Sequence, residues 1–414
     1  MRKILILAAM TLAGAVTYAG GYRVSVQGNR SLAMGHTGVA VVNSAELAFH
    51  NPAGLVYLEN KLSISAGATA VFSEVAWQNQ QYGEVYRADN PVGTPFYINA
   101  AYKISDDFSV GLSVTTPYGS TVEWPTDWPG SHLVNNISLQ AFYIQPLVAY
   151  KISDFISVGG GPILVIGSVE FNRNLNRTLT DIDGNRSNVT IDASGVTEFG
   201  WSASAMINPA DGWRIGINYR SEVIMNAEGG KADFQNIPNT PLAPFQDTNF
   251  DASLPMPAEL AIGVSYEMND KWLFAFDYNR AYWGVYESLD IQFANGVESI
   301  NPRNYEDANI WRFGAQYGAT DKLTLRVGYY YDETPVQPGY FAPETPRNDS
   351  QGFTAGLSLE VAPRLALDAS FAYVRFSEVD ASYDHYEEDG VAMPFRGTYK
   401  SNAFIAGLGL TYNL

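Results

Sequence analysis

The side chains that could do catalytic or metal chemistry are few and far apart, because the chain has no cysteine and only four histidines. His36, His50, His132 and His385 are scattered, and no pair has the His-x-x-x-His spacing of a helical metal site. Ser131 precedes His132, but a nucleophile and its base must meet in space, which adjacency in sequence does not provide. We therefore predict no catalytic residue, no metal ligand and no cofactor, and we do not expect an enzyme.

Two acidic segments have part of the composition of a cation site. Asp181-Ile182-Asp183-Gly184-Asn185 looks like half of a calcium loop, but no glutamate follows at the spacing of that motif. The hairpin chemistry of Asp-Gly explains the segment better. The acidic residues between 377 and 390 are interpreted as a solvated loop rather than a dedicated metal site.

Composition narrows the classes of protein further. The net charge of −18 argues against a phosphate-binding surface, and therefore against a nucleic acid partner. Mean hydropathy is only −0.11, and beyond the N-terminus no run of about 18 apolar residues forms a membrane helix. Charged residues make up 16%, below the usual figure of about 25% for soluble domains, while Tyr numbers 26 and Gly 37. This balance suits side chains that alternate between two environments.

The first nineteen residues have the pattern of an export signal. Arg2 and Lys3 precede an apolar core, residues 4–16, and Thr17-Tyr18-Ala19 ends in the small residue that a signal peptidase requires. The core is too short for a membrane anchor, the alternative interpretation. The sequence predicts a signal peptide over residues 1–19 and complete passage across the inner membrane.

Six short polar turns recur along the chain, each between apolar or aromatic residues. Asn, Asp, Gly and Pro favour tight turns, and aromatic residues beside them fit the interfacial girdle of a membrane barrel. The turns lie within residues 102–108, 150–155, 207–213, 266–272, 317–323 and 359–365.

The runs between these turns alternate with a period of two. Leu323, Leu325 and Val327 share one face of a strand, whereas Thr324 and Arg326 share the other. With both termini on the short-turn side, six short turns require seven long loops and fourteen strands. Long connections lie at about residues 77–94, 120–136, 174–189, 227–255, 294–307, 334–349 and 377–398. The sequence predicts a 14-stranded antiparallel transmembrane β-barrel over residues 61–414, because a soluble sandwich would not need this regular alternation of loops.

Residues 20–60 do not follow the strand pattern. They contain small residues, several glycines and the phrase from Phe49 to Leu55. A barrel of this size has a wide lumen. We therefore predict that residues 20–60 form an N-terminal hatch that plugs it.

Three groups of residues now carry a resemblance to a known family. They are Asn51-Pro52-Ala53 after the stretch 35–40, Tyr118-Gly119 followed by Glu123-Trp124, and residues 332–336 with Asp349 and Phe353. Because of these residues, the chain resembles the FadL-type (OMPP1/FadL/TodX) long-chain fatty acid transporters of the Gram-negative outer membrane. It departs from that family at its last residue, Leu414, where an aromatic residue is usual. The resemblance implies a monomeric, hatch-plugged barrel in contact with outer membrane lipid and lipopolysaccharide, inserted by the barrel assembly machinery. In that setting, divalent ions bridging to lipopolysaccharide are an alternative for the acidic loop.

An apolar substrate would need a landing site outside the barrel. The loop predicted at 227–255 is the longest and carries many apolar residues, including Phe245 and Phe250, and it leads into Leu254 and Met256. Such patches often mark binding, although these side chains could instead close the barrel mouth.

A fatty acid would also present a carboxylate, which is costly to bury without a cation. Arg173 matches a basic head-group contact of the family, and Arg303 is nearest to the second. Ion pairs within the lumen or loops are the alternative for both arginines.

The resemblance implies sideways release through a gap beside a kinked third strand, here residues 108–116. Pro117-Tyr118-Gly119 follows it, and because Pro cannot donate to a ladder and Gly tolerates a bulge, a break in pairing is expected. An ordinary turn at the strand end is the alternative. We hypothesise that Asn51-Pro52-Ala53 lies against this gap and that rearrangement of the hatch opens it.

The predicted function is uptake of long-chain fatty acids or related apolar molecules. Uptake of aromatic hydrocarbons is a close variant. An accessory platform for a protein partner and a general porin are the alternatives from other classes, and these predict a stable partner and ion conductance, respectively.

Overall fold

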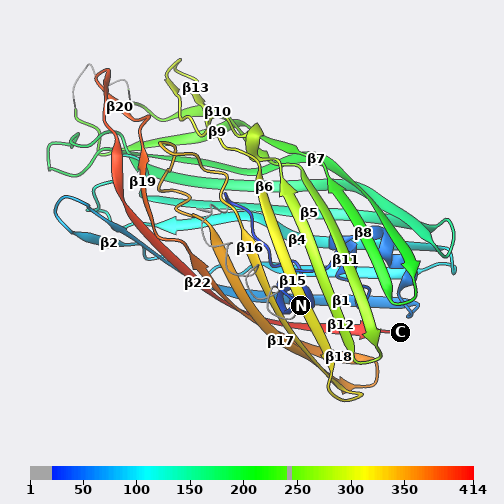
Figure 1. Ribbon diagram of the computed structural model, residues 1–414. Helices are drawn as coiled ribbons and strands as arrows, with labels where there is room; N and C mark the ends of the chain where they lie inside the picture. Colours follow the sequence, from blue (N-terminus) through cyan, green and yellow to red (C-terminus); the bar gives the residue numbers. More distant parts are fainter. Residues whose placement is uncertain (1–20, 240–244) are drawn as a thin grey trace, which may run out of the picture.

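The computed structural model describes residues 21–239 and 245–414, which form a closed antiparallel barrel around an N-terminal segment (Figure 1). Fourteen strands make the wall, each bonded to the next in the order given. They are β1 (Leu62–Gln78), β3 (Phe96–Lys103), β4 (Phe108–Glu123), β5 (Asn136–Lys151), β6 (Ile156–Asn174), β7 (Asn188–Ala210), β8 (Trp213–Arg220), β11 (Glu259–Asn269), β12 (Trp272–Ala281), β15 (Ala308–Gly318), β16 (Leu323–Asp332), β17 (Ser350–Ala362), β18 (Leu365–Phe376) and β22 (Phe395–Asn413). The predicted fold class is confirmed, whereas the predicted signal peptide, residues 1–19, lies outside the described residues.

All six predicted short turns join neighbouring strands at one end of the barrel. At the other end, the connection predicted at 227–255 is mostly strand, which corrects the expectation of a long loop. There β9 (Val223–Gln235) and β10 (Thr248–Met256) pair with each other and continue β8 and β11 outward. Residues 231–235 of β9 also pair with β7, so this outer part of the strand is paired on both sides at Lys231 and Ala232. The next long connection, residues 282–307, joins β12 to β15.

Shorter elements fold over this outer end. Strands β2 (Val85–Arg87) and β19 (Val379–Tyr383) pair with β1 and β22, and β13 (Ile291–Phe293) pairs with β10 and β14 (Glu298–Ser299). A separate hairpin joins β20 (Glu387–Glu388) to β21 (Val391–Ala392), and η2 (Trp283–Val285) begins the long connection. These short strands therefore extend the paired wall at its outer end.

Side chains alternate between lipid and lumen as the sequence pattern predicts. On β15 and β16, Phe313 and Val327 are exposed at 48% and 58%, while their neighbours Arg312 and Arg326 are buried. Apolar residues face outward because hydrocarbon surrounds the wall, and polar residues face a lumen where they find partners. None of the described helices is long and apolar enough to cross a membrane.

The first and last strands close the barrel. Strand β1 pairs with β22 from Ser63–Asn413 to Gln78–Thr398. The seam ends in two backbone hydrogen bonds, in which Leu62 N donates to Leu414 O at 3.1 Å and Leu414 N donates to Leu62 O at 2.8 Å. No strand edge of the wall is left open along this seam.

Residues 21–58 fill the lumen, as the dark blue segment of Figure 1 shows, and we refer to them as the hatch. They contain α1 (Asn29–Ala33), α2 (Leu47–His50) and η1 (Pro52–Tyr57). Charged side chains fasten the hatch to the wall. Arg30 Nε donates to Asp368 Oδ1 at 2.9 Å, and Asp277 Oδ2 accepts from the amides of Gly38 and Val39 at 2.7 and 3.1 Å.

Candidate functional site

An apolar cavity lies above the hatch, and the empty space in and around it, open solvent included, is about 900 Å³. Three of the residues predicted to bind substrate, Phe250, Leu254 and Met256, line it. They do so from β10, where Phe250 and Met256 are almost completely buried. They are therefore wall residues of an inner cavity and not an exposed landing loop, because pairing of β9 with β10 turns them inward.

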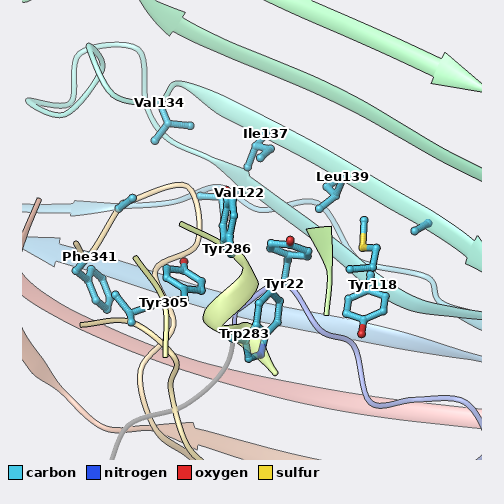
Figure 2. Close-up of a cluster of buried hydrophobic side chains, with 14 of the residues drawn as sticks. Tyr22, Tyr118, Val122, Val134, Ile137, Leu139, Trp283, Tyr286, Tyr305 and Phe341 are labelled. Atoms are coloured by element: carbon cyan, nitrogen blue, oxygen red, sulfur yellow. The ribbon is translucent and has the colours of Figure 1, made fainter. Parts of the chain in front are cut away.

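Aromatic side chains form the floor and one side of this cavity. Figure 2 shows Tyr22 of the hatch beside Trp283, Tyr118 and Tyr286. The Tyr22 ring lies 4.8 Å from the ring of Trp283 and 5.8 Å from that of Tyr286, both edge to face. Tyr22 and Tyr286 also line the cavity. The hatch thus supplies part of its surface.

Phe245 is not among the residues that line the cavity. It stacks on Phe234, at the outer end of β9, with ring centroids 5.7 Å apart. Of the four apolar residues predicted, the structure therefore brings three together and leaves Phe245 in the outer hairpin.

A second pocket shares part of its lining with the apolar cavity, and it brings Arg173 and Arg303 together. Arg303 forms a buried ion pair with Glu344 and donates to the Tyr383 hydroxyl at 3.0 Å. Burial is the largest single influence on Arg303 and lowers its pKa, but the Glu344 carboxylate together with the neighbouring tyrosine hydroxyls outweighs burial and raises the pKa of Arg303 above its ordinary value. Glu344 lines both pockets, so the two share a wall at this carboxylate.

Arg173 has a different environment. It is partly buried at the outer end of β6, and its Nη2 donates to Ser299 Oγ at 3.1 Å. Two carboxylates of the surrounding loops are already paired with other arginines, Glu344 with Arg303 and Glu388 with Arg177. Among the residues that the structure describes, no carboxylate lies within 4.0 Å of the Arg173 guanidinium.

The ladder between β3 and β4 stops half-way along β4. Its last pair is Tyr97–Thr115, and the pairing of β4 with β5 shifts register between Thr115 and Tyr118. Because β4 continues to Glu123, the interruption lies within a strand and is not a strand-end turn: Tyr118 and Gly119 keep their pairing with β5 but have none with β3.

The hatch occupies the edge of β4 that β3 leaves free. Val24 N donates to Pro117 O at 2.8 Å and Gly119 N donates to Tyr22 O at 2.9 Å. Between them, the Arg23 guanidinium binds Glu259 at 3.1 Å and Asp332 at 2.7 Å. Residues 22–24, which we name the gap segment, therefore pair with the part of β4 that β3 leaves unpaired.

Asn51-Pro52-Ala53 lies elsewhere, which corrects the hypothesis that it faces the gap. Asn51 Nδ2 donates to the carbonyls of Val39 at 2.8 Å and Ala205 at 3.1 Å. Ala53 N donates to Ser204 Oγ at 2.9 Å, and Ala53 O accepts from Ser157 Oγ at 2.7 Å. The motif is thus bonded to β6 and β7, where the Asn51 side chain also caps η1.

The sequence pattern did not single out Arg23 or Glu344. Arg23 follows the predicted cleavage site, and Glu344 lies in a Pro-rich loop, so neither belongs to an alternating run. Only the fold reveals their partners. Within residues 21–239 and 245–414, no three His, Asp or Glu side chains are arranged to hold a metal ion.

Comparison with known proteins gives a consistent result. The family described as Outer membrane protein transport protein (OMPP1/FadL/TodX) matches residues 10–414. The 47 kDa outer membrane protein of Pasteurella multocida is 24% identical over 431 residues, covering 99% of this chain and 98% of the relative. The long-chain fatty acid transport protein of Escherichia coli K12 is 22% identical over 443 residues, covering 97% and 98%.

Solved structures share the fold. A FadL homologue of Pseudomonas aeruginosa superposes with a TM-score of 0.81 at 18% identity, covering 95% of this chain and 100% of that one. The toluene transporter TodX of Pseudomonas putida gives a TM-score of 0.72 at 16% identity, covering 96% and 99%.

Proposed function

Because this chain belongs to the OMPP1/FadL/TodX family of outer membrane transport proteins, we propose that it carries long-chain fatty acids or related amphiphiles into the outer membrane. The apolar tail occupies the apolar cavity, and the carboxylate binds at Arg173 in the adjoining pocket. One observation favours a carboxylic acid over an uncharged substrate. Arg173 lines the pocket beside the apolar cavity without a carboxylate partner, and an anionic head group would compensate that charge.

Entry and exit follow from the surfaces that the substrate would meet. The stacked rings of Phe234 and Phe245 offer an apolar contact at the outer hairpin, from which the substrate enters the cavity. An apolar tail gains little from leaving into water. Release therefore occurs sideways between β3 and β4, after the gap segment, residues 22–24, has left the edge of β4.

Aromatic hydrocarbons are the second candidate. The cavity wall is largely apolar, and the rings of Tyr22 and Tyr286 in it suit planar ligands. The Pseudomonas putida neighbour is a toluene transporter by name. The two candidates differ at Arg173, because a hydrocarbon has no charge for the guanidinium to bind.

The test is oleate uptake by cells that lack their own outer membrane fatty acid transporter. Wild type should restore uptake, and Arg173→Gln should lower it about tenfold, since a charge-assisted hydrogen bond is lost. Arg177→Gln is the matched control, because Arg177 forms an ion pair with Glu388 in a loop. This variant should take up oleate as wild type does.

Surface levels are compared by heat-modified mobility of the folded barrel. No oleate uptake above empty vector would refute the acid proposal. Uptake of toluene independent of Arg173 would then favour the aromatic candidate, and a co-purifying protein without any uptake would favour the accessory platform.

A further inference from the structure

The polar pocket beside the cavity has an unusual balance of charge. Two guanidinium groups, those of Arg173 and Arg303, line it together with one carboxylate, that of Glu344. The other polar side chains there, including Asn301 and Tyr383, are uncharged. Arg303 and Glu344 are bonded to each other and are exposed at only 7% and 8%. The pocket therefore has one positive charge that its own residues leave unmatched.

We propose that Glu344 sets the charge of the head group that this pocket accepts and restricts it to a single negative charge. This inference rests on the proposed function and names the substrate class more closely. A monocarboxylate makes the pocket neutral, with two cations facing two anions. A dianion such as a phosphate monoester places excess negative charge next to the buried Glu344 carboxylate, where repulsion is weakly screened.

Glu344 is placed where its charge acts directly on the head group of the ligand. It lines both the polar pocket and the apolar cavity, so a head group at Arg173 with its tail in the cavity shares the pocket with this carboxylate. Arg303 is held by Glu344 and Tyr383, so it has no free charge to offer a second anionic oxygen. Neutral head groups are also disfavoured, because they leave the positive charge of Arg173 without a negative partner.

The experiment measures equilibrium binding of hexadecanoate, hexadecyl phosphate and hexadecanol to the purified full chain near pH 8, where the phosphate is a dianion. Wild type should bind hexadecanoate most tightly. Glu344→Gln removes one negative charge and should improve hexadecyl phosphate relative to hexadecanoate by on the order of tenfold. Glu378→Gln, in an exposed pair with Lys400, is the control and should change neither affinity.

The double variant Arg303→Gln/Glu344→Gln decides between charge and shape. It restores the wild-type count of one unmatched cation, so the preference for hexadecanoate should return. An unchanged ratio in Glu344→Gln, or a double variant that keeps the ratio of Glu344→Gln, would overturn the inference. Failure of the proposed function is seen separately, in wild type alone, as hexadecanol binding as tightly as hexadecanoate or no binding at all.

Discussion

A covalent link between the gap segment and β4 should stop lateral passage. Arg23 and Tyr118 face each other as an antiparallel bridge, flanked by the hydrogen bonds from Val24 to Pro117 and from Gly119 to Tyr22. This arrangement is a narrow pair, with Cα atoms about 4.5 Å apart, which a disulfide can span. The chain has no cysteine, so Arg23→Cys/Tyr118→Cys would form its bond without competition.

The contacts of the gap segment give the expected size of the effect. Two backbone hydrogen bonds contribute about 1 kcal/mol each, and the bonds of Arg23 to Glu259 and Asp332 about 1.5–3 kcal/mol each. The closed state is then favoured by roughly 5–8 kcal/mol, so spontaneous opening is rarer than about one in a thousand. Replacing Arg23 removes both of its ion pairs, which are the larger part of the free energy that favours the closed state. The reduced double variant should therefore transport at least as well as wild type, while the oxidised form should fall to the level of empty vector.

The assay is oleate uptake by the same cells before and after a membrane-permeant reductant, with the disulfide followed by mobility of the barrel. Arg23→Cys and Tyr118→Cys alone serve as controls, and neither should respond to the reductant. Equal uptake by the oxidised and reduced double variant would refute passage through this opening and any role for the gap segment as its gate.

Three further predictions concern the opening, the hatch and the outer loops. Gly119→Arg should abolish uptake with the barrel still folded, because a Cβ at Gly119 lies 3.8 Å from the Val24 side chain and a long side chain would fill the gap; normal uptake would argue against the route. Asn51→Ala loses its hydrogen bonds to the wall and the hatch, which contribute about 1–3 kcal/mol. The variant should therefore show higher ion conductance in planar bilayers, and unchanged conductance would mean that Asn51 does not hold the hatch. Burial, together with the positive charge of Arg177, lowers the pKa of His132 from 6.5 to about 4. The packing of the loop around His132 is therefore fully stable above pH 6.5 and loses stability as the pH falls toward 4. Proteolysis of residues 124–135 should therefore be faster near pH 5 in wild type but not in His132→Phe.

The wall of the barrel could be predicted from sequence because each strand meets the same two environments. Leu325 and Val327 must face hydrocarbon and Arg326 must face the lumen, whatever the neighbouring strands are. Turn chemistry fixed the strand ends for a similar local reason. Where pairing continues beyond the membrane, as in β9 and β10, the same alternation looks like an apolar loop, and the prediction at 227–255 was wrong.

The site could be predicted only in part because its members come from distant strands. Alternation says that Phe250 and Arg173 can point inward, but not which side chains they meet across the lumen. Arg303 and Glu344 become partners only once two outer loops fold over the same pocket. The placement of Asn51-Pro52-Ala53 at the gap failed for the same reason, since a break in β4 does not reveal which part of the hatch fills it.

The seam between β1 and β22 determines how this protein can fold. The Ser63 hydroxyl donates to Asn413 across a sequence separation of 350 residues, and every other pair of the seam is comparably distant. Contacts of such high contact order form late, because a long loop must close before they give any stability. Until then the chain presents two unpaired edges, each able to join another chain. The ring is completed in one final step, and a block to pairing of β22 would leave all the other strands in an aggregation-prone sheet.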